Sequence, residues 1–300
     1  MSFKLTVLGC SSATPTLERH SSAQVLNVNE RLFLIDCGEG AQIQMRRFRI
    51  KFQRIDHIFI SHLHGDHYLG LMGLLFTFHL LGRKKELHLY ADHDLKEILD
   101  MQLEISRTTL GYPLVFHPLD CSRSEIIYED ESVMIRTIPM DHRIPTTGFL
   151  FREKPKDRKI RKEILQNVNI PVDVFDSIKK GHDFTDGNGR FYKNSELTTE
   201  GSTSVTYAYC SDTGYTDSYL SVIQGVDVLY HEATFLKDKE KNAREKFHCT
   251  ASDAANTALK AGVKKLMLGH YSARYYDLTP LLDEAKAIFS NTVLAEEGKV

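Results

Sequence analysis

The feature that most constrains this chain is a dense run of metal-donor side chains, SHLHGDH at residues 61–67. Three imidazoles and a carboxylate within six residues are not explained by core packing. Residues two apart in an extended segment point the same way, so His62 and His64 can bind one ion. Gly65 permits a sharp turn, after which Asp66 and His67 can face a second ion. The run predicts a metal-binding loop between a strand and a helix.

Further donors follow strand-like segments elsewhere in the chain. His142 comes after the β-rich run 132–139, Asp212 after 204–210 and His270 after 264–268. Singly, each of these three residues could equally cap a helix or lie in the core. Together with the His-rich loop they indicate ligands gathered at one rim of a sheet.

The apolar periodicity predicts alternating strands and helices, typical of a layered α/β protein. The predicted strands are 3–9, 22–28, 31–36, 55–61, 87–91, 114–117, 126–128, 132–139, 147–152, 204–210, 226–230 and 264–268. The predicted helices are 40–50, 66–80, 92–106, 250–261 and 280–289. Residues 153–200 are charge-dense at their start and contain the hairpin-turn signal DGNG at 186–189. We expect this segment to be an inserted arm with little core of its own.

Composition excludes several classes of protein. The chain has 38 Lys and Arg against 40 Asp and Glu, which argues against a globally basic nucleic-acid binder but not against a local basic patch. The longest apolar run, 69–81, contains His79 and is too short to span a bilayer, so we expect no membrane association. We interpret VLGC at residues 7–10 as part of a first strand, not a lipoprotein box, because too few apolar residues precede it. Five cysteines without a CxxC pair predict reduced thiols and a cytoplasmic protein.

Several motifs together resemble those of the metallo-β-lactamase superfamily and, within it, the ribonuclease Z family. The metal loop HLHGDH at 62–67 and the preceding LIDCGEG at 34–40 are similar to the superfamily pattern. The narrower resemblance to ribonuclease Z is carried by HEAT at 231–234, HCTA at 248–251 and GHYSARY at 269–275. It extends from about residue 4 to 289.

This resemblance implies a fold, a cofactor and an activity. The fold would be a metallo-β-lactamase αβ/βα sandwich of two mixed β-sheets flanked by helices, one domain over 1–300 with the arm at about 153–200. The activity would be that of a zinc-dependent endoribonuclease that removes the 3′ trailer of precursor tRNA by metal-activated hydroxide attack. The enzyme would be a homodimer with two Zn²⁺ per subunit. The resemblance assigns His62, His64 and His142 to one ion, Asp66, His67 and His270 to the other, and Asp212 to both.

The resemblance also implies catalytic roles for residues near the metal ions. Asp66 would accept a proton, and His248 would be the general acid that protonates the departing 3′-oxygen. Glu232 would orient His248 or hold it charged. The alternative for His248 is a cap on the helix near residue 250, or simple surface exposure. Asp36 is interpreted as a loop-ordering group and not as a ligand.

Basic side chains near these motifs are candidates for RNA contact. The tentative set is Arg46, Arg47, Arg49, Lys51 and Arg274. Residues 152–163 add a second patch, with seven basic and three acidic side chains. Such patches suit a phosphate backbone, although a solvated helix face is the usual reason for a charge run.

Two segments depart from the pattern of the ribonuclease Z family and leave the substrate open. The stretch 169–181 lacks the Gly-Pro pair that family members use to grip tRNA, and Leu17 and His20 replace a Lys and an Asn in a recognition loop. The main alternative is therefore a dinuclear zinc phosphodiesterase acting on cyclic nucleotides or on other small or RNA phosphodiesters. A β-lactam or thioester hydrolase fits HEAT and HCTA less well. A catalytically inactive RNA-binding scaffold conflicts with the complete donor set.

Overall fold

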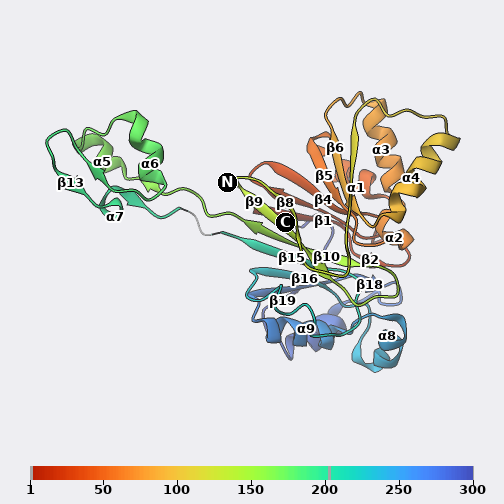
Figure 1. The fold of residues 1–300 in the computed structure, drawn as a ribbon. Helices are drawn as coiled ribbons and strands as arrows, with labels where there is room; N and C mark the ends of the chain where they lie inside the picture. The colour runs from red at the N-terminus through yellow and green to blue at the C-terminus, as the bar shows by residue number, and fades with distance from the viewer. Residues whose placement is uncertain (1–2, 202–203, 300) are drawn as a thin grey trace. The chain divides into compact units, whose positions relative to one another are not determined.

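The computed structural model describes residues 3–201 and 204–299, and the chain divides into two compact units. The first unit is built from Met1–Arg152 and Thr206–Val300, and the second from Glu153–Val205. Figure 1 shows the first unit as two layers of strands with helices on the outside. This is the predicted sandwich of two mixed β-sheets, and that prediction is confirmed.

The first sheet has the strand order β1-β3-β4-β5-β6-β7. Its strands β1, β3 and β4 pair antiparallel, whereas β4 to β7 pair parallel. The strands are β1 (Phe3–Gly9), β3 (Ala23–Val28), β4 (Arg31–Cys37), β5 (Ile55–Phe59), β6 (Leu87–Ala91) and β7 (Leu114–Pro118). The helical segments associated with it are α1 (Ala41–Arg47), η1 (Phe52–Arg54), α2 (Gly65–Tyr68), α3 (Leu71–Leu80) and α4 (Asp94–Ile105).

The second sheet has the strand order β19-β17-β16-β15-β10-β9-β8. Strands β15, β16, β17 and β19 are parallel, and β10 joins β15 antiparallel. The strands are β8 (Ile126–Glu129), β9 (Val133–Pro139), β10 (Thr147–Glu153), β15 (Thr206–Cys210), β16 (Val228–Glu232), β17 (Lys265–Gly269) and β19 (Thr292–Leu294). The remaining elements of this unit are β2 (Ser11–Ser12), η3 (Lys237–Lys239), α8 (Glu240–Lys246), α9 (Ala251–Ala261), β18 (Tyr271–Ser272) and α10 (Thr279–Lys286).

Aromatic side chains fill the space between the two sheets. The rings of Phe59 and Phe149 have centroids 5.4 Å apart, and those of Phe33 and Phe151 are 5.9 Å apart. Each pair joins a strand of the first sheet to β10 of the second. Tilted aromatic pairs of this kind contribute about 0.5–1.5 kcal/mol beyond the burial of their area. The layer fixes the two sheets together below the strand ends that carry the donor residues.

The C-terminal segment ties both sheets to the N-terminal strand. Gly298 N–H donates to Val7 O (2.9 Å), and Ala295 N–H donates to Leu268 O (2.8 Å). The Glu297 carboxylate accepts from the backbone N–H of His20 (2.5 Å) and lies 2.9 Å from His20 Nδ1. These contacts fix the loop that connects β2 to β3.

The predicted helix 66–80 is interrupted, because α2 and α3 are separate helices. Gly70, which lies between them, donates its N–H to Cys37 O (2.9 Å). A Cβ at Gly70 would lie 2.2 Å from Gly38 O, so the approach of the two backbones requires glycine. The break holds α2, which carries Asp66 and His67, against the end of β4.

The second unit, which contains the predicted arm, has a small apolar core. Ile170, Ile178 and Leu197 are buried together, with further side chains packed around them. The DGNG turn is confirmed, because Phe184 pairs with Tyr192 across it. The elements are β11 (Lys159–Ile160), α5 (Lys162–Asn167), η2 (Val172–Val174), α6 (Phe175–Lys179), β12 (Phe184–Thr185), β13 (Phe191–Tyr192), α7 (Asn194–Leu197) and β14 (Thr198–Thr199).

Two further observations bear on the cellular setting. Within the described part of the chain, no helix has both the length and the apolar character needed to span a bilayer. All five cysteines are unpaired, and four of them are buried.

Candidate metal centre

The predicted donor residues converge where strands of the two sheets end. His62 and His64 lie in the loop after β5, and His142 lies in the turn after β9. Asp212 follows β15 and His270 follows β17. Because neighbouring parallel strands end at the same edge of a sheet, donors far apart in sequence meet there.

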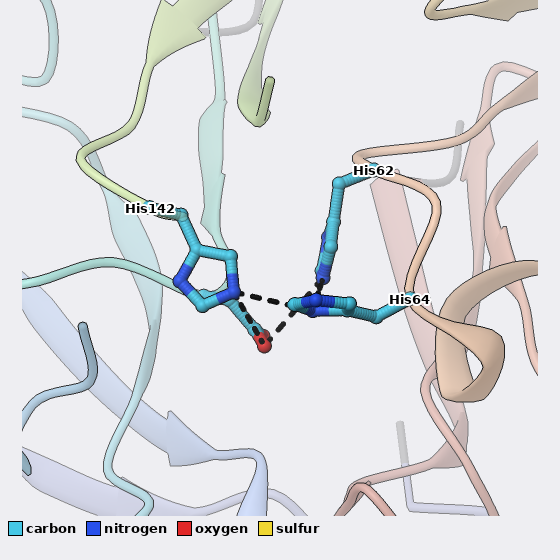
Figure 2. Close-up of side chains that lie close together, drawn as sticks. His62, His64 and His142 are labelled. Carbon is cyan, nitrogen blue, oxygen red and sulfur yellow. Dashed lines mark hydrogen bonds and ion pairs between the residues drawn. The ribbon is translucent and has the colours of Figure 1, made fainter. Parts of the chain in front are cut away.

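The first group consists of His62, His64, His142 and Asp212, whose donor atoms all lie within 4.8 Å of one another. Figure 2 shows the three imidazole rings turned toward one another from different segments of the chain. His64 Nδ1 lies 3.0 Å from His62 Nε2 and 3.2 Å from His142 Nε2. Asp212 Oδ2 lies 3.6 Å from His62 Nε2 and 3.9 Å from His142 Nε2.

The second group consists of Asp66, His67 and His270, and it shares Asp212 with the first. Asp66 Oδ2 lies 3.4 Å from His67 Nε2 and 3.3 Å from His270 Nε2, and those two nitrogens are 3.3 Å apart. The other oxygen of Asp212, Oδ1, lies 3.3 Å from His67 Nε2 and 3.1 Å from His270 Nε2. One carboxylate therefore faces both groups, with a separate oxygen for each.

These distances fit tetrahedral metal coordination. Four ligands at zinc bond lengths of about 2.0–2.1 Å would be separated by about 3.3–3.4 Å along each edge of the tetrahedron. The five donor distances of the second group, 3.1–3.4 Å, match that edge, and those of the first group, 3.0–3.9 Å, scatter around it. In the described part of the chain the ion-pair partners of Asp212 are all histidines. The donor set fits divalent metal ions.

The second nitrogen of four of the histidines is also engaged, which fixes the orientation of each ring. His67 Nδ1 lies 2.7 Å from Asp36 Oδ2, and His142 Nδ1 donates to Phe247 O (2.9 Å). His270 Nδ1 lies 3.0 Å from Thr234 Oγ1, and His62 Nδ1 lies 3.0 Å from Ser61 Oγ. Burial and the neighbouring His67 lower the pKa of His62 well below its usual range, so its ring is neutral, the form that binds metal.

Asp36 holds the metal loop without belonging to either donor group. Its carboxylate accepts from Ser61 N–H (2.7 Å), Ser61 Oγ (2.9 Å) and the Tyr209 hydroxyl (2.6 Å), in addition to His67. Ser61 precedes the metal loop and Tyr209 belongs to β15, so this fully buried side chain connects the first sheet to the second.

His248 and Glu232 form a buried pair beside the two groups. His248 Nδ1 lies 2.8 Å from Glu232 Oε1, and Glu232 also accepts from Thr213 N–H (2.9 Å) and the Thr234 hydroxyl (2.6 Å). Burial alone would lower the pKa of His248, but the charge and hydrogen bond of Glu232 outweigh it and raise the pKa to about 9. His248 Nε2 is 4.0 Å from Asp212 Oδ2, and its donor atom also groups with Asp212 and His270.

An open cleft of about 350 Å³ leads to these side chains. His64, Asp66, Asp212, His248 and His270 line it, together with residues of the loop that follows β2. In that loop, Ala13 N–H donates to Asp66 Oδ2 (2.7 Å). The two residues that depart from the family pattern lie in the same loop: Leu17 is fully exposed, and His20 contacts Glu297.

The predicted RNA-contact residues lie elsewhere. Arg46, Arg47, Arg49, Lys51 and Arg274 are all exposed, and none is among the described residues that line the cleft. The guanidinium groups of Arg46 and Arg274 lie over the rings of Phe52 and Phe235, each at 5.1 Å.

Several groups that hold the donors were not identified from the sequence. The Ala13 N–H and the Phe247 carbonyl are backbone groups, which no side-chain pattern marks. Thr234 was inside the HEAT motif, so its position was a signal, but its contact with both His270 and Glu232 follows only from the fold.

Comparison with known proteins gives two matching family models. The model described as Anti-Pycsar protein Apyc1 matches residues 3–160, and that of the beta-lactamase superfamily domain matches residues 190–271. The two matches together cover most of the chain.

Curated proteins and solved structures match over nearly the full length. A ribonuclease Z of Bacteroides fragilis is 47% identical over 296 residues, covering 99% of this chain and 97% of its own. A ribonuclease Z of Phocaeicola vulgatus is 48% identical, with coverages of 98% and 96%. The crystal structure of human tRNase Z, short form, has a TM-score of 0.70 at 27% identity and covers 98% of this chain and 96% of the human one.

Proposed function

This chain belongs to the ribonuclease Z family of the metallo-β-lactamase superfamily, and on that basis we propose that it removes the 3′ trailer from precursor tRNA. It is a hydrolase of the endoribonuclease type, and its substrate is tRNA. The observation that carries this conclusion is the near-full-length similarity to proteins named ribonuclease Z, in a chain whose donor residues are all gathered at one cleft.

The fold and the donor groups indicate that the enzyme uses divalent metal ions. We propose two zinc ions per chain, one held by His62, His64 and His142 and the other by Asp66, His67 and His270, with Asp212 shared. The support is that the measured donor separations suit zinc and that imidazole and carboxylate are among its usual ligands. When bound, such ions withdraw electron density from a scissile phosphate and make water acidic enough to attack it near neutral pH.

The residues around the ions would handle protons. Asp66 lines the cleft, where its carboxylate can accept a proton as well as hold an ion. His248 would donate a proton to the departing 3′-oxygen, because Glu232 keeps its ring charged and oriented. The nitrogen that is not bonded to Glu232, Nε2, is the one available to the cleft.

We also propose that the enzyme is a cytoplasmic homodimer that contacts RNA through its exposed basic side chains. Large apolar side chains on the helices outside the first sheet support the dimer: Ile43 and Leu80 are 65% and 79% exposed. Sedimentation of the purified chain tests the proposed dimer, and a monomer at micromolar concentration would contradict it.

The arm and the set Arg46, Arg47, Arg49, Lys51 and Arg274 would bind the phosphate backbone.

The decisive experiment uses a precursor tRNA with a 3′ trailer and the zinc-loaded protein. We expect a single cut on the 3′ side of the discriminator nucleotide that a chelator abolishes and added zinc restores. A small chromogenic phosphodiester runs beside it. Cleavage of the small ester alone would show a working metal centre with a different substrate, such as cyclic nucleotides, and would overturn the tRNA assignment.

A further inference from the structure

The cleft is lined by one arginine, for which the described residues provide no ion-pair partner. Arg143 directly follows the donor residue His142, in the turn between β9 and β10, and it is exposed. Among the described residues that line the cleft, it is the only Lys or Arg. No carboxylate in the described part of the chain forms an ion pair with Arg143, so its charge is available to a ligand in the cleft.

The backbone that carries Arg143 is held in place. Asp141 N–H donates to Thr213 Oγ1 (3.1 Å), and Asp141 O accepts from Gly214 N–H (2.7 Å). The turn is closed by Met140 N–H, which donates to Thr146 O (3.2 Å). The backbone of Arg143 therefore has a fixed place beside the first donor group, while its exposed side chain can turn toward an anion in the cleft.

The exposed Glu39 also lines the cleft, and its carboxylate would repel a polyanionic substrate, whereas Asp66 and Asp212 belong to the donor groups. Arg143 offsets the charge of Glu39. Arg143 lines the same cleft as His64, a residue of the first donor group. A guanidinium presents paired N–H donors that match two oxygens of one phosphate.

The contacts of the neighbouring residue place Arg143 on one side of the cleft. The rings of His142 and His248 have centroids 5.3 Å apart, and His142 Nδ1 donates to the carbonyl of Phe247, the residue before His248. The loop that contains Ala13 instead contacts Asp66, in the other donor group. Arg143 thus follows a residue in contact with the segment of His248, which under the proposed function protonates the leaving 3′-oxygen; the His248 ring lies between the two donor groups, 5.3 Å from His142 and 5.6 Å from His270.

We propose that Arg143 binds the phosphate on the 5′ side of the last nucleotide of the mature tRNA, next to the scissile phosphate. This inference rests on the proposed function. It gives the cleft a direction: the mature 3′ end lies along Arg143 and His248, and the trailer leaves past the loop of Ala13.

The test combines the variant Arg143→Gln with a modified precursor tRNA. In this substrate, the phosphate on the 5′ side of the last mature nucleotide is replaced by a neutral methylphosphonate. The sugar on the 5′ side of that linkage is 2′-deoxy, which keeps the linkage stable. A precursor with the same deoxy sugar and an ordinary phosphate is the reference. On the reference, Arg143→Gln should lower kcat/KM by about 10- to 100-fold, the usual effect of losing a hydrogen-bonded ion contact. On the methylphosphonate substrate, variant and wild type should differ by less than about threefold, since the contact is already absent. Arg143→Lys should fall between the two, because lysine cannot bind in a paired manner.

Matched controls separate this contact from a general loss of charge or of structure. Arg123→Gln removes an exposed arginine that pairs with Asp120 and Glu125 outside the cleft, and it should leave both substrates unaffected. The zinc content and unfolding transition of Arg143→Gln should equal those of the wild type.

Three results would overturn the inference: no loss in Arg143→Gln, an equal loss on both substrates, or a loss that disappears only when the phosphate on the 3′ side of the cut is neutralised. Each of these leaves the proposed function standing as long as the wild type cuts the ordinary precursor. If the wild type did not cut it, the proposed function would fail and this inference with it.

Discussion

Four of the eight non-glycine residues with positive φ in the described part of the chain hold the donor groups. Ala13, Asp36, Phe247 and His270 all have positive φ, at 60°, 55°, 57° and 56°. This left-handed conformation is unfavourable for residues other than glycine, and it persists where the surrounding structure enforces it. At these positions it aims an N–H at Asp66, a carboxylate at His67, a carbonyl at His142 and the His270 ring at both carboxylates. The strained backbone costs conformational free energy at each of these residues, but it fixes the geometry of the donor groups.

Ala13 offers a direct test of that exchange. Ala13→Gly keeps the N–H and relieves the strain, so kcat/KM should stay within about threefold of wild type. Ala13→Val places a β-branched side chain at positive φ and should displace the N–H from Asp66, lowering kcat/KM by about 10- to 100-fold. Steady-state kinetics on precursor tRNA measures both. If valine were tolerated as well as glycine, the loop would not be positioning Asp66.

His248 and Glu232 give a second prediction at the level of single residues. His248→Ala should lower turnover by about two to four powers of ten, the usual contribution of a general acid, and leave the bound metal unchanged. Glu232→Gln should have a smaller effect, because the amide still accepts the hydrogen bond of His248 but carries no charge. Metal analysis of the purified variants decides whether His248 is a general acid or a metal ligand. Loss of zinc from His248→Ala would make it a ligand, since its donor atom also lies close to those of Asp212 and His270.

At the scale of elements, strands with apolar alternation were predicted well, and elements defined by their partners were not. The predicted strand 87–91 is β6 to the residue, and 3–9 is β1. Helix α8 was missed, because KNAREK offers no apolar periodicity and only Ala243 of the helix is buried. Strand β19 was missed because three residues carry too little pattern, and its pairing with β17 defines it.

The same distinction applies to the candidate site. The seven predicted donors could be found in the sequence because each is a His or Asp either in the His-rich run 62–67 or just after the end of a strand, and the structure gathers all of them into two groups. The groups that orient them could not, because a backbone carbonyl at residue 247 or an N–H at residue 13 depends on φ and not on residue type. Arg143 carried a weak signal in its adjacency to His142, but the absence of an ion-pair partner for it among the described residues is a property of the fold.

The junction of α8 and α9 supports His248 and yields a prediction about pH. Asp253 accepts from Arg244 (2.9 and 3.0 Å) and from Thr250 N–H (2.9 Å), so it caps α9 and ties it to α8. Burial alone would raise the pKa of Asp253, but these hydrogen bonds hold it below its ordinary range. A depressed pKa means that the charge stabilises the fold above the ordinary pKa, and that this contribution is lost as the pH falls through the lower folded value.

Asp253→Asn should therefore destabilise the protein by about 1–2 kcal/mol at pH 7, the usual cost of a weakened cap and ion pair. The difference from wild type should shrink as the pH falls from about 5 toward 3. Urea unfolding of both proteins across this range measures it. Asp217→Asn is the control, since its ion pair with Lys260 is exposed and should matter by less than about 0.5 kcal/mol. A difference independent of pH would show that packing, and not charge, is responsible.

At the scale of the molecule, the strand pairing shows where the second unit could be removed from the chain. Arg152 pairs with Thr206, and Glu153 N–H donates to Val205 O (2.9 Å), so both ends of the second unit leave from one hairpin. Replacing residues 154–204 by Asn-Gly should close that hairpin with a two-residue turn. We expect the shortened protein to fold, to bind zinc and to cleave a small phosphodiester within about threefold of wild type, because all donors lie in the first unit.

The shortened protein should lose at least about tenfold in kcat/KM on precursor tRNA, through KM, because phosphate contacts in the arm would be removed. The comparison of the two substrates is the measurement. Equal activity on precursor tRNA would show that the arm does not bind the substrate, and loss of activity on the small ester would show that the two units do not fold separately.

The contacts between Glu297 and His20 have a consequence for the synthesis of the enzyme on the ribosome. While the chain is still growing on the ribosome, the loop beside Asp66 lacks its anchor and His270 is among the last donors to be translated. A nascent chain therefore has the His-rich loop but no complete cleft until Glu297 has been synthesised and released. From the order of synthesis we therefore expect cleavage to begin only after residues 270 and 297 have been translated.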